Sequence, residues 1–257
     1  MSRSRARVGL GRAAVTTCLV ATVLGHVEPA AALRPFDLTD AAVADRGRIE
    51  LELGPFGRLR ERGSKWSIVP AVVVNVGLAD ERELVLEGKL QRATAGGDAE
   101  TPRTSLVDTA LSLKQVLRRG ALQDASGMSV ANECGILLPT WHSERGVGAG
   151  CSLIASAQWP MTTVHLNGAL SFNRAHHWTR LLGGIVEGPG EWPVRPAAEV
   201  WAEREVGGSS ARSALVALIW RESEHLSFDA GARRETRDGI TIRELRGGLT
   251  WFFGVGK

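Results

Sequence analysis

Apolar and polar residues alternate at every second position over long parts of the chain. Between Thr241 and Phe253, one set of alternate positions from residue 245 holds Leu, Gly, Leu, Trp and Phe, whereas the positions between them hold Arg, Gly, Thr and Phe. A period of two residues is typical of a β-strand with two unlike faces. Because similar segments recur from Gly47 onward, the pattern predicts an all-β chain.

Twelve such segments are separated by residues that favour turns. Gly188-Pro189-Gly190 and Asp238-Gly239 are examples, since Gly, Pro and Asp supply the backbone angles of tight turns. The predicted strands are residues 47–61, 65–78, 82–92, 104–117, 127–138, 149–158, 162–174, 178–187, 192–205, 210–222, 225–234 and 240–254. Their alternation argues against helices and against parallel strands that are buried on both faces.

The number of strands indicates which face points outward. About eight strands already give a barrel interior that side chains can fill. A ring of twelve with its apolar face inward would therefore enclose an unfilled hydrophobic hole, whereas the same face turned outward would contact lipid. We predict a single antiparallel transmembrane β-barrel, which closure protects from unpaired edge strands. A soluble two-sheet sandwich is the structural alternative.

The first 46 residues lack the alternation and divide into two parts. Arginines in the first twelve residues precede an apolar stretch, residues 13–24, and the small residues Ala30 to Ala32 follow it. This order is typical of a cleaved secretory signal peptide, which we assign to residues 1–32. We expect residues 33–46 to be a polar periplasmic leader and residues 47–257 to form a barrel in the bacterial outer membrane.

The charge of the chain is balanced once the predicted signal peptide is removed. The whole sequence has 31 basic and 28 acidic residues, and the signal contains four Arg and only Glu28, which leaves 27 of each sign. A basic footprint for nucleic acid is therefore absent, and no nucleic-acid partner is predicted. The sequence has no Tyr, so its eight Trp must supply the aromatic residues at the membrane interface. We expect Trp159, Trp192, Trp220 and Trp251 near the rim that carries both ends, and Trp66 and Trp178 near the other rim.

The polar faces of the predicted strands carry charges of both signs. Two interpretations remain open: a pore lining that filters small polar solutes by size and charge, or a lattice of ion pairs that fills the barrel. The candidate lumen-lining residues are Glu50, Glu52, Glu87, Lys89, Asp108, Lys114, Glu133, His165, Asn167, Arg195, Glu199, Asp229, Arg233, Glu244 and Arg246.

Two cysteines remain after the signal peptide, and they flank a predicted hairpin loop. Cys134 and Cys151 could lie opposite each other and form a disulfide in an oxidising compartment. We favour the alternative, two unpaired small side chains on a lipid-facing wall. No metal or cofactor is predicted, because two thiolates make a poor zinc site and the loop pair His176 and His177 lacks a third ligand.

A hydrolase is the rival class of function. The segment His165–Gly168, followed by Ser171, resembles pieces of outer-membrane phospholipase A, a twelve-stranded barrel. That family places its nucleophilic Ser where this chain has Leu166, and Ser171 lies too far along the strand to replace it. We therefore expect no hydroxyl within reach of the His165 imidazole and no enzymatic activity.

Several segments resemble a known group of barrels. They are residues 34–43 and 49–54, followed by residues 106–114, 163–168 and 248–253. These segments resemble a group of outer-membrane transporter-like barrels that is similar to the family named after the meta-pathway of phenol degradation. The resemblance implies an outer-membrane barrel with a transport role. Residues 254–257 depart from barrels that end on a terminal Phe.

The expected function is that of a passive channel or transporter-like pore for small molecules. Outer-membrane lipid, the barrel-assembly machinery and small-molecule solutes are the expected partners. A closed barrel with a structural role in the envelope is the alternative.

Overall fold

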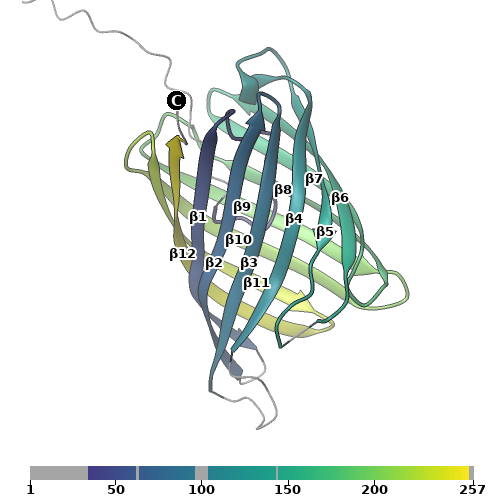
Figure 1. Ribbon diagram of the computed structural model, residues 1–257. Helices are drawn as coiled ribbons and strands as arrows, with labels where there is room; N and C mark the ends of the chain where they lie inside the picture. Colours follow the sequence, from purple (N-terminus) through teal and green to yellow (C-terminus); the bar gives the residue numbers. More distant parts are fainter. Residues whose placement is uncertain (1–33, 62–63, 96–103, 143, 255–257) are drawn as a thin grey trace, which may run out of the picture.

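Twelve strands close into one barrel in the computed structural model, which describes residues 34–61, 64–95, 104–142 and 144–254 (Figure 1). The predicted signal peptide, residues 1–32, lies outside the described residues. The strands are β1 Arg48–Glu61, β2 Ser64–Ala79, β3 Arg82–Ala95, β4 Thr104–Arg118, β5 Ser129–Leu137, β6 Gly148–Trp159, β7 Thr162–Phe172, β8 Trp178–Glu187, β9 Val194–Glu205, β10 Ser210–Arg221, β11 Leu226–Arg237 and β12 Ile240–Gly254. One 3₁₀ turn, η1 Ala121–Gln123, lies between β4 and β5.

Each strand pairs antiparallel with its neighbours in sequence, and β1 closes the ring on β12. At the closure, Ile49 lies opposite Phe253 and Leu51 opposite Trp251. The observed strand bounds differ from the predicted ones by at most three residues. The prediction of a single twelve-stranded antiparallel barrel is confirmed. No helix in the described ranges is long and apolar enough to cross a membrane.

The alternation places apolar side chains on the outside of the barrel. In β10, Val216 and Leu218 are 64% and 55% exposed, whereas Leu215 and Ile219 on the inner face are 1% exposed. Other exposed apolar side chains are Leu86, Leu113, Leu153, Leu166, Leu182, Val200 and Leu245. An apolar belt of this kind is typical of a barrel whose outer face contacts lipid.

Exposed Trp side chains mark the two rims. We call the rim where β1 begins and β12 ends the terminal rim. Near it, exposed Trp residues occur at 159, 192, 220 and 251, as predicted. Trp178, also exposed, begins β8 at the opposite rim. The side chain of Trp66 is outside the described part.

Candidate functional site

The N-terminal segment, which we define as residues 34–46, lies across the lumen of the barrel. We expected a periplasmic leader here. The structure differs, because the segment bonds to side chains from β3, β4, β6, β7, β9, β11 and β12. It forms no strand of its own, and Figure 1 shows it in purple between the walls of the barrel.

Five backbone N–H groups of the segment donate to side chains of the barrel wall. Those of Asp37 and Leu38 both donate to the Glu199 carboxylate, at 2.8 Å each. The other three donor–acceptor pairs are Thr39 with Asn167, Ala41 with Ser156, and Ala44 with Glu83. A buried chain without a strand partner needs such acceptors, since an unpaired buried N–H is costly. The wall therefore replaces the hydrogen bonds that a neighbouring strand would provide.

Arg34 fits a socket that glycines leave open. Its Nε donates to Asp229 Oδ2 at 3.1 Å, and the side chains of both residues are almost fully buried. A Cβ atom at Gly54 or Gly248 would lie 2.6 Å or 2.5 Å from atoms of the guanidinium group. Glycine at these two positions is what allows the arginine to enter the wall.

Asp37 is clamped between two arginines. Its carboxylate accepts from Arg246 Nη1 at 2.8 Å, from Arg233 Nη1 at 2.9 Å and from Trp201 Nε1 at 3.3 Å. Burial opposes ionisation of Asp37, but the two guanidinium groups outweigh it and hold its pKa well below the usual range. Arg246 also donates to the backbone carbonyl of Pro35 at 2.8 Å. The segment is thus fixed by charge as well as by its backbone.

Further along the segment, a buried lysine and a glutamine bond to it. Lys114 Nζ lies 3.4 Å from Asp40 Oδ1 and 3.4 Å from Glu83 Oε1. It also donates to the hydroxyl of Thr39 at 3.2 Å. From the turn η1, the Gln123 side chain donates to the backbone carbonyl of Ala41 at 2.8 Å.

Apolar packing completes the fit. Leu38 is buried against Ile185 and Trp201, and Phe36 packs against the same cluster. Ala41 is buried against Ala131 and Ile154. The inner face of the barrel is therefore not uniformly polar, since its apolar patches contact the apolar residues of the segment.

The segment divides the lumen into two unlike parts. A cavity of about 860 Å³, which we call the vestibule, lies between the segment and the opposite rim. Phe36, Asp37 and Leu38 contribute to its floor, and its outer wall includes Leu59, Gln91, Thr179 and Arg237. On the other side of the segment lies the terminal half, where inward side chains such as Ser129, Ile219 and Thr250 are buried.

The predicted lumen residues are distributed over both parts. Eleven of them are buried: Glu50, Glu52, Lys114, His165, Asn167, Arg195, Glu199, Asp229, Arg233, Glu244 and Arg246. Eight of the fifteen line the vestibule: Glu52, Lys114, Asn167 and Arg233 from the buried set, and the other four, Glu87, Lys89, Asp108 and Glu133. Six of the fifteen bond directly to the N-terminal segment, namely Lys114, Asn167, Glu199, Asp229, Arg233 and Arg246. The residues that sequence reasoning missed are those of the segment itself. The composition of the segment could have indicated its buried position, because Arg-Pro-Phe-Asp-Leu contains more apolar residues than a solvated linker usually does.

A hydroxyl does lie within reach of His165, so the prediction that none would was wrong. Ser156 is opposite His165 on the neighbouring strand β6, and its Oγ is 2.8 Å from Nδ1 of the imidazole. Nε2 of the same ring is 3.0 Å from Glu187 Oε1, and Glu187 accepts from Arg195 Nε at 2.7 Å. However, Ser156 is 0% exposed and its Oγ accepts the N–H of Ala41. In this arrangement the serine holds the segment and is shielded from solvent.

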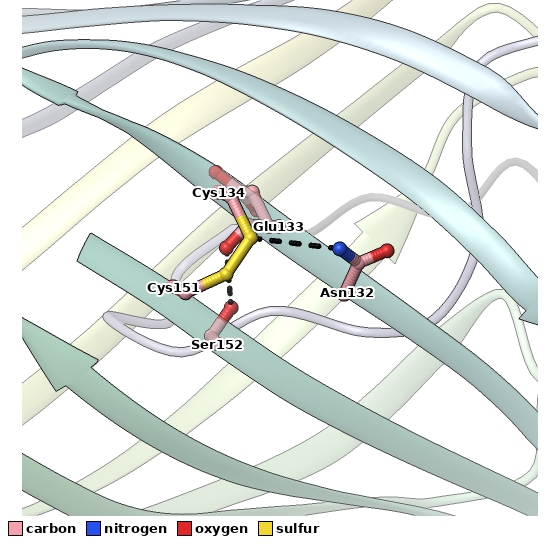
Figure 2. The surroundings of a disulfide bond; sticks show 5 residues. All are labelled: Asn132, Glu133, Cys134, Cys151 and Ser152. Carbon is pink, nitrogen blue, oxygen red and sulfur yellow. Dashed lines mark hydrogen bonds between the residues drawn. A yellow bond between two sulfur atoms is a disulfide. The ribbon is translucent and has the colours of Figure 1, made fainter. Parts of the chain in front are cut away.

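Cys134 and Cys151 form a disulfide between β5 and β6 (Figure 2). The two residues are directly opposite in register, with their Cα atoms 4.1 Å apart. We favoured unpaired thiols, and the structure differs because the register brings the two side chains together. Cys151 is exposed, and the alternation along β6 places its side chain on the face opposite to that of Ser152; both residues contribute to the lining of the vestibule. The bond therefore links two strands of the vestibule wall.

The loop histidines have local partners. His177 Nδ1 lies 2.9 Å from Glu205 Oε1, and the ring of His176 stacks on Phe172. Within the described ranges, no group of three or more His, Cys, Asp or Glu residues is arranged to hold a metal ion.

Comparisons with known proteins identify the fold. No protein-family model and no curated protein matches the sequence. Among solved structures, the KdgM porin covers 79% of this chain and 98% of its own, with a TM-score of 0.51 and 11% identity. The same values hold for the KdgM porin in complex with disordered oligogalacturonate. An outer-membrane channel from Pseudomonas putida F1 covers 82% of this chain and 97% of its own, with a TM-score of 0.54 and 11% identity. The chain therefore has the fold of outer-membrane porins and channels.

Proposed function

We propose that this chain is a passive outer-membrane channel for small polar solutes. The observation that carries the proposal is a closed twelve-stranded barrel with an apolar outer belt and a charged vestibule of about 860 Å³. The likeness to porins and channels supports the fold on which it rests. Within that class, we propose membership of the transporter-like group similar to the meta-pathway of phenol degradation family.

The cellular setting follows from the same proposal. Residues 1–32 direct export and are removed, the barrel-assembly machinery inserts the strands, and outer-membrane lipid surrounds the apolar belt. Neither a metal nor a cofactor takes part, since filtering by a pore requires only its diameter and its lining groups.

The vestibule lining favours solutes without a large net charge. Glu87 and Glu133 line it together with Lys89 and Arg237, and Lys89 lies 3.6 Å from Asp108. The KdgM porin has been solved with oligogalacturonate, an acidic sugar chain. The mixture of signs here does not match such a polyanion. We therefore propose neutral or zwitterionic polar solutes as the class that enters this vestibule.

Passage in this proposal requires the N-terminal segment to move, because the segment forms the floor of the vestibule. Conductance in planar bilayers tests this. The wild-type chain should open rarely, and Arg34→Ala/Asp37→Ala should show frequent unitary openings, since both anchors of the segment are lost. Both proteins must be folded, which is checked on gels, where an unboiled folded barrel migrates differently from a boiled one. If both are folded and neither opens, the chain has a structural role in the envelope and is not a channel.

Hydrolysis is the second candidate, because Ser156, His165 and Glu187 form a hydrogen-bonded series. We propose that the series is structural and that the chain is not an enzyme, since Ser156 is buried beneath Ala41. We expect no hydrolysis of phospholipid micelles. Activity that disappears in His165→Ala would establish the enzyme instead.

A further inference from the structure

The contacts of the N-terminal segment are of two kinds. Five of them use backbone N–H groups, which do not depend on the identity of the side chains. Others depend on side chains: Arg34 in its glycine socket, Asp37 in its arginine clamp, and Phe36 and Leu38 in the apolar cluster. The wall thus combines side-chain acceptors for the backbone N–H groups of a peptide with selective pockets for its side chains. This combination is typical of a peptide-binding groove.

We infer that the lumen wall is a peptide-binding site, filled in cis by residues 34–46 and able to bind the same sequence in trans. The inference deepens the proposed channel function, on which its biological meaning rests. Binding of a peptide can nevertheless be measured without any passage of solute.

The pockets define the class of peptide. Arg34 and Asp37 are three residues apart, and the pockets that receive them lie on β11 at Asp229 and on the pair Arg233 and Arg246. The segment turns at residues 34–35 and bends at residues 37 and 38 between these pockets. The ligand is therefore a bent peptide with Arg and Asp at this spacing and apolar residues beside the Asp.

The segment is held mainly by bonds to side chains of the wall and not by the backbone ladder that joins each barrel strand to its neighbours. It forms no strand and no ladder with its neighbours. Among the described residues, Arg34 Nη2, Asp229 Oδ1 and Glu199 Oε1 are buried without a hydrogen-bond partner. Each such group reduces the net stabilisation of the docked state. These features make the segment the part of the barrel that can leave while the strands remain paired.

A peptide added in trans must compete with the segment in cis. The segment joins β1 directly after Arg46 and Gly47, and a short tether gives an effective concentration of about 1 mM. Micromolar peptide should therefore bind poorly to the wild-type chain. The test requires a receptor in which the cis segment is weakened.

The experiment uses a fluorescein-labelled peptide of residues 34–46 and the full chain in detergent micelles. The main receptor is Arg34→Ala/Asp37→Ala, the second is a chain without residues 34–46, and heat-modifiable migration checks that each is folded. Fluorescence anisotropy should show saturable binding to both, and binding at least about tenfold weaker to the wild-type chain.

A double-mutant cycle tests the pocket itself. A peptide with Arg34→Ala should bind the main receptor about tenfold more weakly, because it loses a charged hydrogen bond. With Asp229→Ala added to the receptor, the two peptides should differ little. Absence of binding to folded receptors, equal binding to the wild-type chain, or equal binding of both peptides would overturn the inference. Peptide binding without conductance in any variant would contradict the channel and leave the peptide site intact.

Discussion

The two halves of the lumen are built by the same alternating strands but differ in what fills them. In the terminal half, inward polar side chains such as Ser156 and His165 are buried and bonded to each other, and Ser156 also accepts the N–H of Ala41 in the N-terminal segment. In the vestibule, Glu87 and Asp108 are exposed although they too face inward. Alternation decides which side chains point into a barrel. Whether they line a space or fill it depends on a segment outside the strands.

The change with the largest expected effect is Asp37→Arg, which would make the two halves alike. A third guanidinium group beside Arg233 and Arg246 should expel the segment from the lumen. Ala41→Cys, buried in the parent chain, should then react with a maleimide roughly a hundredfold faster. Asp80→Arg, on an exposed turn, is the matched control and should leave the rate unchanged. An unchanged rate in Asp37→Arg would contradict the clamp.

Removing the disulfide should affect the vestibule wall and not the segment. Cys134→Ser/Cys151→Ser removes a link between residues 17 positions apart. We expect the free energy of unfolding in denaturant to fall by about 3 kcal/mol. The fraction unfolded is measured from the shift in migration of the barrel on gels. The labelling of Ala41→Cys should stay slow. Fast labelling would mean that the two halves are coupled through this wall.

Replacing the acceptor shared by two backbone amides should loosen the terminal half more gently. Glu199→Ala leaves the N–H groups of Asp37 and Leu38 without their partner, at a cost of about 2 kcal/mol. Hydrogen exchange at these two amides should accelerate about thirtyfold in consequence. In Glu199→Gln, which keeps one acceptor oxygen, the exchange rate of these amides should lie between those of the wild-type chain and Glu199→Ala. Equal protection in all three proteins would show that Glu199 does not hold the segment.

The smallest expected effect comes from filling the Arg34 socket. Gly248→Val places carbon atoms where the guanidinium group of Arg34 lies, but the aliphatic part of the arginine can bend away. We therefore expect docking of the segment to be destabilised by about 1 kcal/mol and labelling of Ala41→Cys to become severalfold faster. Gly254→Val is the control, because a Cβ there meets nothing within 4 Å. An equal response in both variants would count against the socket.

The barrel could be predicted from the sequence because its signal is local. A period of two residues specifies the strands and the face on which each side chain lies, and the structure buries residues as distant as Glu50 and Arg246 that this period places on the inward face. The pairing of Ser156 with His165 depends on the register between β6 and β7, which no single strand encodes. The path of the segment was harder still. Its bonds join residues up to 211 positions apart, such as Pro35 and Arg246, and have no periodic signature.

The central claim, that the N-terminal segment lies across the lumen, can be tested by trapping it in place. The backbone N of Ala41 lies 3.0 Å from Ser156 Oγ, so cysteines at these two positions should be close enough to bond. In the membrane-inserted chain carrying Ala41→Cys/Ser156→Cys, we predict a second disulfide once dissolved oxygen oxidises the two thiols, and no such disulfide in Ala41→Cys/Ser209→Cys under the same conditions. Failure of this cross-link to form in a folded barrel would contradict the account.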